Sequence, residues 1–246
     1  MTDEKRRAFL TAEWRYLVML NYDVDPAILH AIVPRHTELD LWNGRAIASV
    51  VGFRFLRTRL LGIPIPLHRN FEEVNLRFYV RHTTPSGDVR RGVVFVRELV
   101  PRLAIALTAR AAYNEPYLAV RMRSTVPSEP VKAPGRVSYE WRTGSRWQIV
   151  SANATGEATL PLPLSEQAFI SEHFWGYTRQ RDGGTVEYEV SHPRWRVWSG
   201  ANPSLVADVP RLYGSSFARA LAGQPASTFI AEGSEVTVFR PRRIGS

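Results

Sequence analysis

The alternation of apolar and polar residues along the chain predicts a protein built mostly of β-strands. Segments with a two-residue period, or short apolar runs bounded by turn residues, are typical of strands. Such segments recur at residues 14–22, 39–42, 45–56, 74–82, 91–96, 117–123, 137–142, 146–151, 158–160, 174–181, 185–191, 194–198, 227–231 and 235–240. Turn residues between neighbouring segments, such as Asn43-Gly44 and Glu232-Gly233-Ser234, indicate hairpins. The pattern therefore predicts a mainly antiparallel sheet.

Four segments show helical spacing instead. Asp25 is a suitable N-cap and Pro26 suits the first helical position, so a short helix is predicted to run to Val33. The other helices are predicted over residues 99–112, 165–173 and 209–221. A few helices among many strands predict an α+β fold that is mainly antiparallel β.

The strand within residues 71–80 has an unusual polar face. Its apolar residues alternate with a row made of Glu73, Asn75, Arg77 and Tyr79. A carboxylate, an amide, a guanidinium and a phenol in one row suit the inside of a barrel, where polar groups meet a ligand. The alternative is an ordinary solvated strand face, on which Glu73 and Arg77 stand about 13 Å apart and do not touch.

The composition is that of a globular protein, since 44% of the 246 residues are hydrophobic and 11% are aromatic. This length fits one large β-domain or two small domains, and the Pro-rich segment 126–135 is either a linker or a loop within one sheet. The absence of cysteine excludes disulfides and thiolate metal sites. With no run of 18 apolar residues and no secretory pattern at the N-terminus, we expect a cytoplasmic protein without a membrane partner.

The net charge of +9 raises the question of nucleic-acid binding. Only Lys5 and Lys132 are lysines, and the arginines are scattered among acids without a helical stripe or a nucleic-acid motif. We therefore expect no nucleic-acid partner. The histidines lack metal-ligand spacing, and the sequence has no Gly-rich phosphate loop, nucleophile elbow or nucleotide fingerprint. No metal site and no cofactor are expected.

Four segments carry a family resemblance. They are residues 71–80, residues 109–113 with Pro116-Tyr117, residues 169–177, and His192-Pro193-Arg194-Trp195. Together they resemble the YqjF-like proteins, the family of domain of unknown function 2071. The resemblance implies a single domain over residues 1–246 with a core at about 14–241. Because that family is grouped with the acetoacetate decarboxylase-like fold, it also implies a cone-shaped β-barrel with a few flanking helices and a closed cavity.

One departure from the decarboxylases bears on chemistry. They form a Schiff base through a lysine that directly follows a proline, whereas the matching place here is Tyr117 after Pro116. Schiff-base chemistry needs an amine. Lys5 lies in a polar N-terminal segment and Lys132 in the Pro-rich segment, so neither is expected to project into a barrel. The chain is therefore not expected to be an acetoacetate decarboxylase.

The sequence and the resemblance together predict an internal pocket for a small carbonyl or carboxylate compound. The candidate ligand-binding residues are Asn75, Arg77, Tyr79, Arg110, Tyr113 and Tyr117. Arginine recognises carboxylates through its planar fork, and a carboxyl group near apolar walls gains a raised pKa suited to proton transfer. Glu73 is therefore the candidate catalytic residue.

A second hypothesis is a non-catalytic binding or interaction protein. In that case Glu73 pairs with Arg77 or Arg110 inside a polar interior that satisfies itself. The decarboxylase-like fold often assembles into oligomers, so the resemblance is compatible with a homo-oligomer. The sequence leaves open whether the protein is an enzyme.

Overall fold

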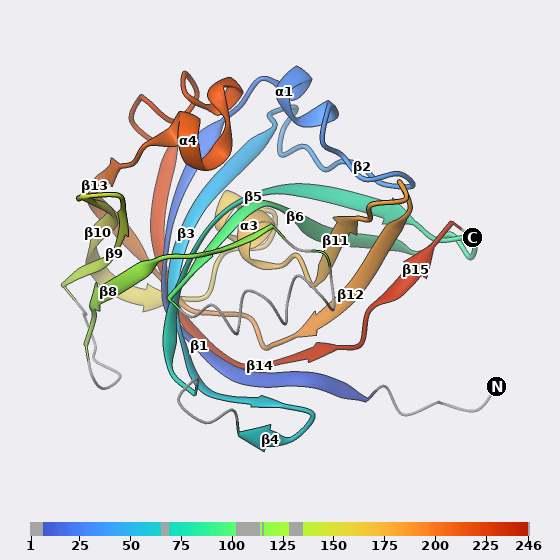
Figure 1. Ribbon diagram of the computed structural model, residues 1–246, viewed down its shortest axis with the longest axis horizontal. Helices are drawn as coiled ribbons and strands as arrows, with labels where there is room; N and C mark the ends of the chain where they lie inside the picture. The colour runs from blue at the N-terminus through green and yellow to red at the C-terminus, as the bar shows by residue number, and fades with distance from the viewer. Residues whose placement is uncertain (1–6, 65–68, 102–113, 115, 128–134, 246) are drawn as a thin grey trace.

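The computed structural model describes residues 7–64, 69–101, 114, 116–127 and 135–245, and its strands all belong to one sheet (Figure 1). Nearly all strand pairs are antiparallel, and the parallel pairs join β6 (Val89–Val100) to β11 (Trp175–Arg179) and to β7 (Tyr117–Ala119). The described helices are short. None of the helices in these described ranges is long and apolar enough to cross a membrane. The predicted α+β class, mainly antiparallel β, is confirmed.

Seven strands form a closed ring, which Figure 1 views nearly end-on. In order around the ring they are β14 (Ser227–Phe239), β1 (Ala8–Asp23), β3 (Ile47–Leu60), β5 (Phe71–Thr83), β6 (Val89–Val100), β11 (Trp175–Arg179) and β12 (Thr185–Ser191). The ring closes where β12 meets β14, through the pairs Val190–Val238 and Ser191–Thr237. A closed ring of this kind is compatible with the expected cone-shaped barrel.

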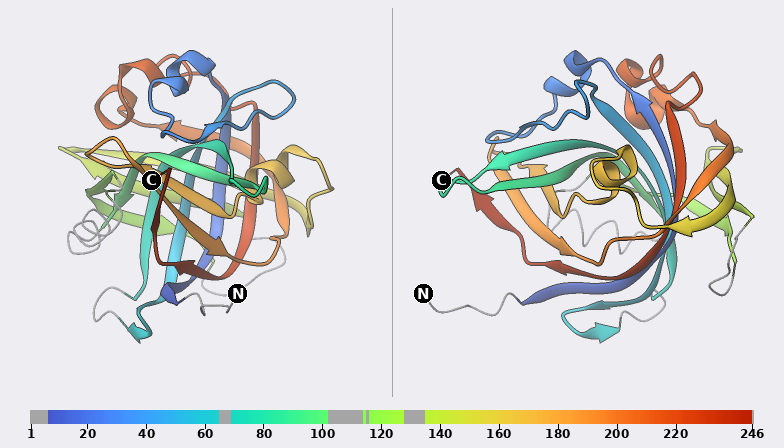
Figure 2. Two further views of the ribbon diagram at one scale, coloured as in Figure 1. Left: turned by 90° about the vertical axis from the view of Figure 1, so that its right-hand side faces the viewer. Right: turned by 180° about the vertical axis from the view of Figure 1, so that it is seen from behind.

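The remaining strands extend or border the ring. A second layer continues from β14 through β13 (Val197–Val206), β10 (Arg146–Thr159), β9 (Arg136–Thr143) and β8 (Arg121–Thr125), and Figure 2 shows it outside the ring. Short strands pair with the ring at its edges, namely β2 (Glu38–Leu39) with β5, β4 (Ile63–Pro64) with β3, β7 (Tyr117–Ala119) with β6 and β15 (Arg242–Ile244) with β12.

Strand β1 is central to the ring because it is paired along both edges. Its partner β3 is close in sequence. Its other partner, β14, pairs with it from Leu10–Val238 to Asn21–Ser227, near the two ends of the described chain. The ring therefore includes a strand pair, β1 with β14, whose contacting residues are more than 200 positions apart.

Strand β5 is buried on both faces over most of its length. On β5 the apolar row made of Val74, Leu76, Phe78 and Val80 faces outward and packs in a core with Val137, Tyr139 and Trp141 of the second layer. The contact with β9 is close, because a Cβ at Gly52 would lie 2.6 Å from the Tyr139 ring. The Tyr139 hydroxyl donates to the Tyr16 carbonyl at 2.8 Å. The opposite face of β5 lies inside the ring.

Three predicted helices are confirmed in part. Helix α1 (Pro26–His30) has Asp25 as its N-cap, whose carboxylate accepts from the Ala27 amide at 2.9 Å. Helix α3 (Glu166–Ser171) is capped by Ser165 and lies within the outline of the ring in Figure 1. The predicted helix 209–221 is wrong in its length, because α4 (Val209–Tyr213) ends at Gly214 and a 3₁₀ turn (Ser215–Phe217) follows.

Three other predictions are wrong. Leu99 and Val100 do not begin a helix but end β6, and residues 102–112 of that predicted helix lie outside the described ranges. The Asn43-Gly44 turn closes only the bridge between Trp42 and Arg45, and β2 pairs with β5 instead of β3. Gly233 does not turn a hairpin. It lies inside the continuous strand β14 with φ of 81°, where a Cβ would lie 1.9 Å from the Trp14 carbonyl oxygen.

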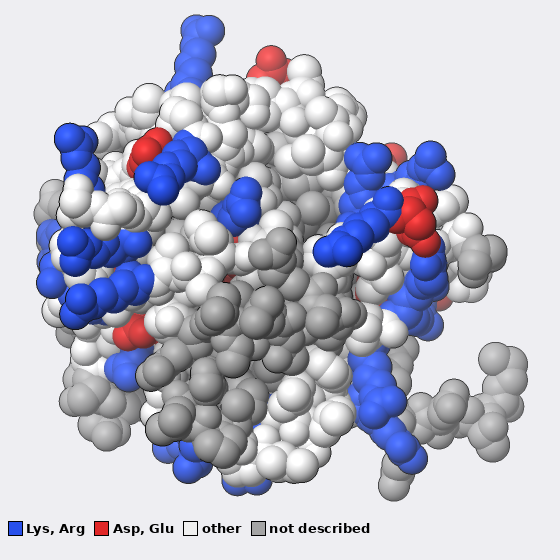
Figure 3. Space-filling view, in the orientation of Figure 1, with Lys and Arg blue, Asp and Glu red and all other residues white. Residues whose placement is uncertain are grey.

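The surface charge is distributed in groups. On the face shown in Figure 3, arginine side chains form several separate clusters, with acidic side chains beside some of them. Ion pairs account for part of this pattern, such as Arg243–Asp182 at 2.6 Å and Arg81–Glu38 at 2.8 Å.

Candidate functional site

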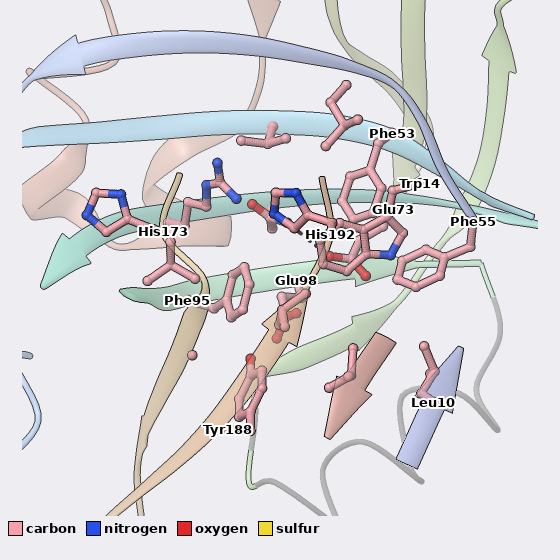
Figure 4. Close-up of a pocket in the computed structure, with 18 of the residues that line it drawn as sticks. Leu10, Trp14, Phe53, Phe55, Glu73, Phe95, Glu98, His173, Tyr188 and His192 are labelled. Carbon is pink, nitrogen blue, oxygen red and sulfur yellow. Dashed lines mark hydrogen bonds between the residues drawn. The ribbon is translucent and has the colours of Figure 1, made fainter. Parts of the chain in front are cut away.

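The interior of the ring holds a cavity of about 210 Å³. Figure 4 shows its walls, to which strands β1, β3, β5, β6, β11, β12 and β14 and helix α3 all contribute. Most of the lining is apolar, and the polar groups come mainly from β5, β6 and the segments next to α3 and β12. This is the usual composition of a small-molecule site, in which a few polar groups orient a ligand between apolar walls.

Aromatic rings form one wall of the cavity. Trp14 makes edge contacts with Phe53 at 5.3 Å and with Phe55 at 5.7 Å, measured between ring centroids. Phe55 stacks on Phe71 at 4.5 Å, and Trp195 lies 6.2 Å from Trp14. These strands bring together aromatic residues far apart in sequence, so this wall excludes water and suits an apolar group.

The predicted polar row of β5 faces this cavity. Glu73, Asn75 and Arg77 all line it and all are buried. The Asn75 amide donates to the Glu73 carboxylate at 2.9 Å, and the Tyr117 hydroxyl also donates to Glu73. Burial raises the pKa of Glu73 from 4.5 to about 7, against the opposing effects of these hydrogen bonds and of the Arg77 charge. Glu73 can therefore hold or release a proton near neutral pH.

Arg77 is a buried cation without a close anion among the described residues. Its guanidinium donates to the Ile170 carbonyl at 3.3 Å and approaches the Met19 sulfur at 3.9 Å. No carboxylate of the described ranges lies within 4.0 Å of it, and its Nε has no hydrogen-bond partner there. The Asn75 side-chain oxygen likewise has no partner in this part of the chain. Two polar groups on the cavity wall are therefore available to a ligand.

The other predicted site residues fall into three groups. Tyr117 lines the cavity as expected. Tyr79 is buried on the same face of β5, but its hydroxyl is engaged with Ser49 at 2.7 Å and its ring packs against Phe169. It supports the wall and does not line the cavity. Arg110 and Tyr113 lie outside the described residues.

Glu98 is a cavity residue that the sequence analysis missed. It is 2% exposed, lines the cavity, and lies on β6 directly opposite Asn75. It lies between the predicted strand 91–96 and the predicted helix 99–112, so neither the strand pattern nor the helix pattern placed its side chain on a buried or an exposed face. A second buried carboxylate gives the cavity two acidic groups, and Figure 4 labels both Glu73 and Glu98 among the residues that line it.

His192 belongs to one of the segments that carry the family resemblance, and its ring has defined contacts in the structure. Its Nδ1 lies 2.8 Å from the Pro193 carbonyl oxygen, and its ring stacks on Trp195 at 4.0 Å with an interplanar angle of 13°. Burial lowers the pKa of His192, and the nearby charge of Arg77 lowers it further. The neutral imidazole is therefore favoured, and it lines the cavity.

His173 has both ring nitrogens engaged. Nδ1 lies 2.5 Å from the Phe169 carbonyl and Nε2 lies 3.0 Å from the Asp40 carboxylate, which also binds Arg91 at 2.6 Å. Burial lowers the pKa of His173. His173 thus links Phe169 of α3 to Asp40, and it is one of the residues that line the cavity. Across the described ranges, no group of three or more histidines, aspartates and glutamates could hold a metal ion.

Comparisons with known proteins agree with this fold. The model of the family named domain of unknown function 2071, described as an uncharacterized conserved protein, matches residues 11–235. The uncharacterized protein YqjF of Bacillus subtilis (strain 168) is 36% identical over 185 residues, which are 74% of this chain and 72% of that protein.

Two solved structures show the same architecture at low sequence identity. Acetoacetate decarboxylase from Legionella pneumophila subsp. pneumophila str. Philadelphia 1 is 12% identical with a TM-score of 0.68, covering 96% of this chain and 87% of the decarboxylase. The enduracididine biosynthesis enzyme MppR, complexed with pyruvate, is 15% identical with a TM-score of 0.66, covering 99% of this chain and 93% of that enzyme. At such identities the likeness shows the fold, and the expected acetoacetate decarboxylase-like architecture is confirmed.

Proposed function

The chain belongs to the family of domain of unknown function 2071, and from this premise we propose that its cavity binds a small carboxylate or carbonyl compound. The observation that carries the proposal is Arg77. A guanidinium cannot lose its charge near neutral pH, and burying it without an anion is costly. A ligand carboxylate provides the anion that is missing within ion-pair distance in the described part of the chain.

Glu73 is the proton-transfer group of this proposal. Because its pKa is about 7, the carboxyl group exchanges protons with a ligand under physiological conditions. It lies two positions from Asn75 and four from Arg77 on one face of β5, so an anion held at Arg77 lies along the same strand as Glu73. In this proposal, negative charge that develops on the oxygen of a bound carbonyl group is stabilised by an acid, Glu73, and by a cation, Arg77.

The proposed chemistry does not use a lysine. Lys5 and Lys132 are the only lysines in the sequence, and both lie outside the described residues. Tyr117, which stands after Pro116, has no amine and instead donates a hydrogen bond to Glu73. Acid–base chemistry at Glu73 therefore takes the place of an imine in this proposal.

A similar enzyme supports the ligand class. MppR shares the fold and has been solved with pyruvate, a small carboxylate that also has a carbonyl group. By analogy with that complex, pyruvate is the first ligand to test here. The analogy is one of fold, so the residues that would bind pyruvate are argued from this chain alone.

A competing function is a non-catalytic binding or interaction protein. It is favoured by the hydrogen bonds that Asn75 and Tyr117 already make to Glu73, which satisfy part of the polar cluster without a ligand. The two functions make different predictions for Arg77. If the buried polar groups pair only with one another, Arg77 is not expected to bind a ligand carboxylate.

The test is a search for a co-purifying ligand followed by binding to two variants. Mass spectrometry under native and then denaturing conditions should release a small acid or carbonyl compound. Calorimetric titration with pyruvate should show binding to the wild type and none to Arg77→Met, which keeps length and removes charge. Arg81→Met is the matched control, because Arg81 is exposed on the same strand and pairs with Glu38. Equal binding by both variants would reject the proposal.

A further inference from the structure

His192 lines the cavity, and one of its two ring nitrogens is engaged by the backbone. A backbone carbonyl oxygen only accepts hydrogen bonds, so the contact at 2.8 Å means that Nδ1 carries a proton and donates to Pro193. In the neutral imidazole Nε2 is then an unprotonated acceptor. No hydrogen-bond partner of Nε2 lies within the described ranges.

The orientation of this ring is restrained on both sides. Trp195 stacks on it at 4.0 Å, and Phe174 lies at 4.8 Å in a tilted arrangement. Trp195 is itself held by the hydrogen bond from its indole Nε1 to Ser234 at 2.9 Å. A ring held by two aromatic contacts and one hydrogen bond is already ordered before a ligand arrives, so little entropy is lost when Nε2 accepts a hydrogen bond.

The charged groups near His192 favour a ligand group that donates a hydrogen bond to Nε2 without carrying a positive charge. The positive charge of Arg77 lowers the pKa of the His192 ring and the negative charge of Glu172 raises it. The effect of Arg77 is the larger of the two. A second cation at this place would be repelled by Arg77. An uncharged hydroxyl group can donate to Nε2 without this cost.

The apolar wall indicates what the rest of the ligand is. The cavity of about 210 Å³ exceeds the apolar cavity of about 150 Å³ that is known to accept benzene. Trp14, Phe53, Phe55 and Phe71 line it next to Glu73. A two- or three-carbon acid leaves this wall without contacts, whereas an aromatic or branched substituent fills it.

On the basis of the proposed function, we infer that His192 Nε2 accepts a hydrogen bond from a ligand hydroxyl, and that the cavity selects hydroxycarboxylates with a bulky apolar substituent. Arg77 pairs with the ligand carboxylate, His192 accepts a hydrogen bond from the ligand hydroxyl, and the aromatic wall packs against the apolar substituent. This assigns His192 a role in specificity and names a ligand class narrower than a small carboxylate.

The experiment compares two probes that differ by one hydroxyl group, 3-phenyllactate and 3-phenylpropionate. Calorimetric titration of the wild type should show about tenfold tighter binding of 3-phenyllactate, the effect of one hydrogen bond. In His192→Phe, which retains stacking on Trp195, the two probes should bind within about twofold of each other. His30→Phe, at an exposed position of α1, is the matched control and should keep the tenfold preference.

A measurement on the wild type keeps the test independent of any folding defect in His192→Phe. The ¹⁵N resonance of His192 Nε2 should shift on addition of 3-phenyllactate and much less with 3-phenylpropionate. Absence of that difference would overturn the inference, as would a tenfold preference that survives in His192→Phe. Tighter binding of phenylalanine than of 3-phenyllactate would also overturn it, because the donor would then be a cation.

The failure of this inference can be told apart from failure of the proposed function. If both acids bind the wild type equally and Arg77→Met abolishes binding, the carboxylate site stands and the role of His192 is wrong. If no acid binds, including pyruvate, both are wrong.

Discussion

Replacement of Glu73 by glutamine should stabilise the protein at alkaline pH and leave it nearly unchanged at acidic pH. Glu73 is 2% exposed, and burial raises its pKa from 4.5 to about 7. Below pH 4.5 the carboxyl group is protonated in both the folded and the unfolded chain. Between pH 4.5 and 7 only the unfolded chain releases the proton, so the free energy of unfolding falls as the pH rises.

The magnitude follows from the size of the pKa change. A change from 4.5 to about 7, at about 1.4 kcal/mol per unit, makes ionised Glu73 cost about 3 kcal/mol above pH 7. Glutamine has the same shape and keeps an oxygen that accepts from Asn75 and Tyr117, but it never ionises. Glu73→Gln should therefore be about 3 kcal/mol more stable than the wild type at pH 8 and within about 1 kcal/mol of it at pH 4.5.

Urea denaturation at pH 4.5, 6 and 8, followed by tryptophan fluorescence, measures both free energies of unfolding. Glu38→Gln is the control, because Glu38 is exposed and its ion pair with Arg81 is worth no more than about 1 kcal/mol. A loss of stability in Glu73→Gln that is equal at all three pH values would refute the reasoning. It would show that Glu73 is an ionised partner within a self-satisfied polar interior, as the competing function requires.

Substitutions at three further positions test how the fold is held together. Gly52→Ala should cost about 1–3 kcal/mol in thermal unfolding, because its Cβ would overlap the Tyr139 ring; an unchanged melting temperature would contradict this packing. Glu187→Gln should cost about 2–3 kcal/mol and speed amide exchange in β15, since the fully buried Glu187 carboxylate binds Arg90 and Arg242, each at 2.6 Å. Ser165→Ala should lower stability by about 1 kcal/mol through loss of the α3 cap, and Ser165→Asp, which can cap the helix, should restore it.

The polar face of β5 could be predicted from sequence because strand alternation is a local property. The two-residue period separated the apolar row from the polar row but left open whether the polar row faces solvent or a barrel interior. In the structure Glu73, Asn75 and Arg77 of the polar row line the cavity, so the solvated alternative is wrong. The predicted N-cap Asp25 was also a local signal, and this cap is present.

The features that could not be predicted depend on partners distant in sequence. Gly233 has the composition of a hairpin turn, yet β14 continues through it because β1 pairs with residues on both sides. Glu98 reaches the cavity because β6 extends to Val100 and its register with β5 shifts at Leu76–Arg77. Neither the shift nor the extension has a signal in single-sequence periodicity. His192 lines the cavity just beyond the end of β12, whose place in the ring is set by its pairing with β14.

The pairing of β1 with β14 has a consequence for synthesis of the protein. Asp23 ends β1 and Ser227 begins β14, so about 200 residues must be translated after β1 before its second edge finds its partner. At 5–20 residues per second this takes roughly 10–40 s. For that time a 16-residue strand rich in apolar residues presents an unpaired edge, which is a template for aggregation. The nascent chain is therefore a natural client for chaperones that bind extended apolar segments, and ring closure follows the completion of translation through β14.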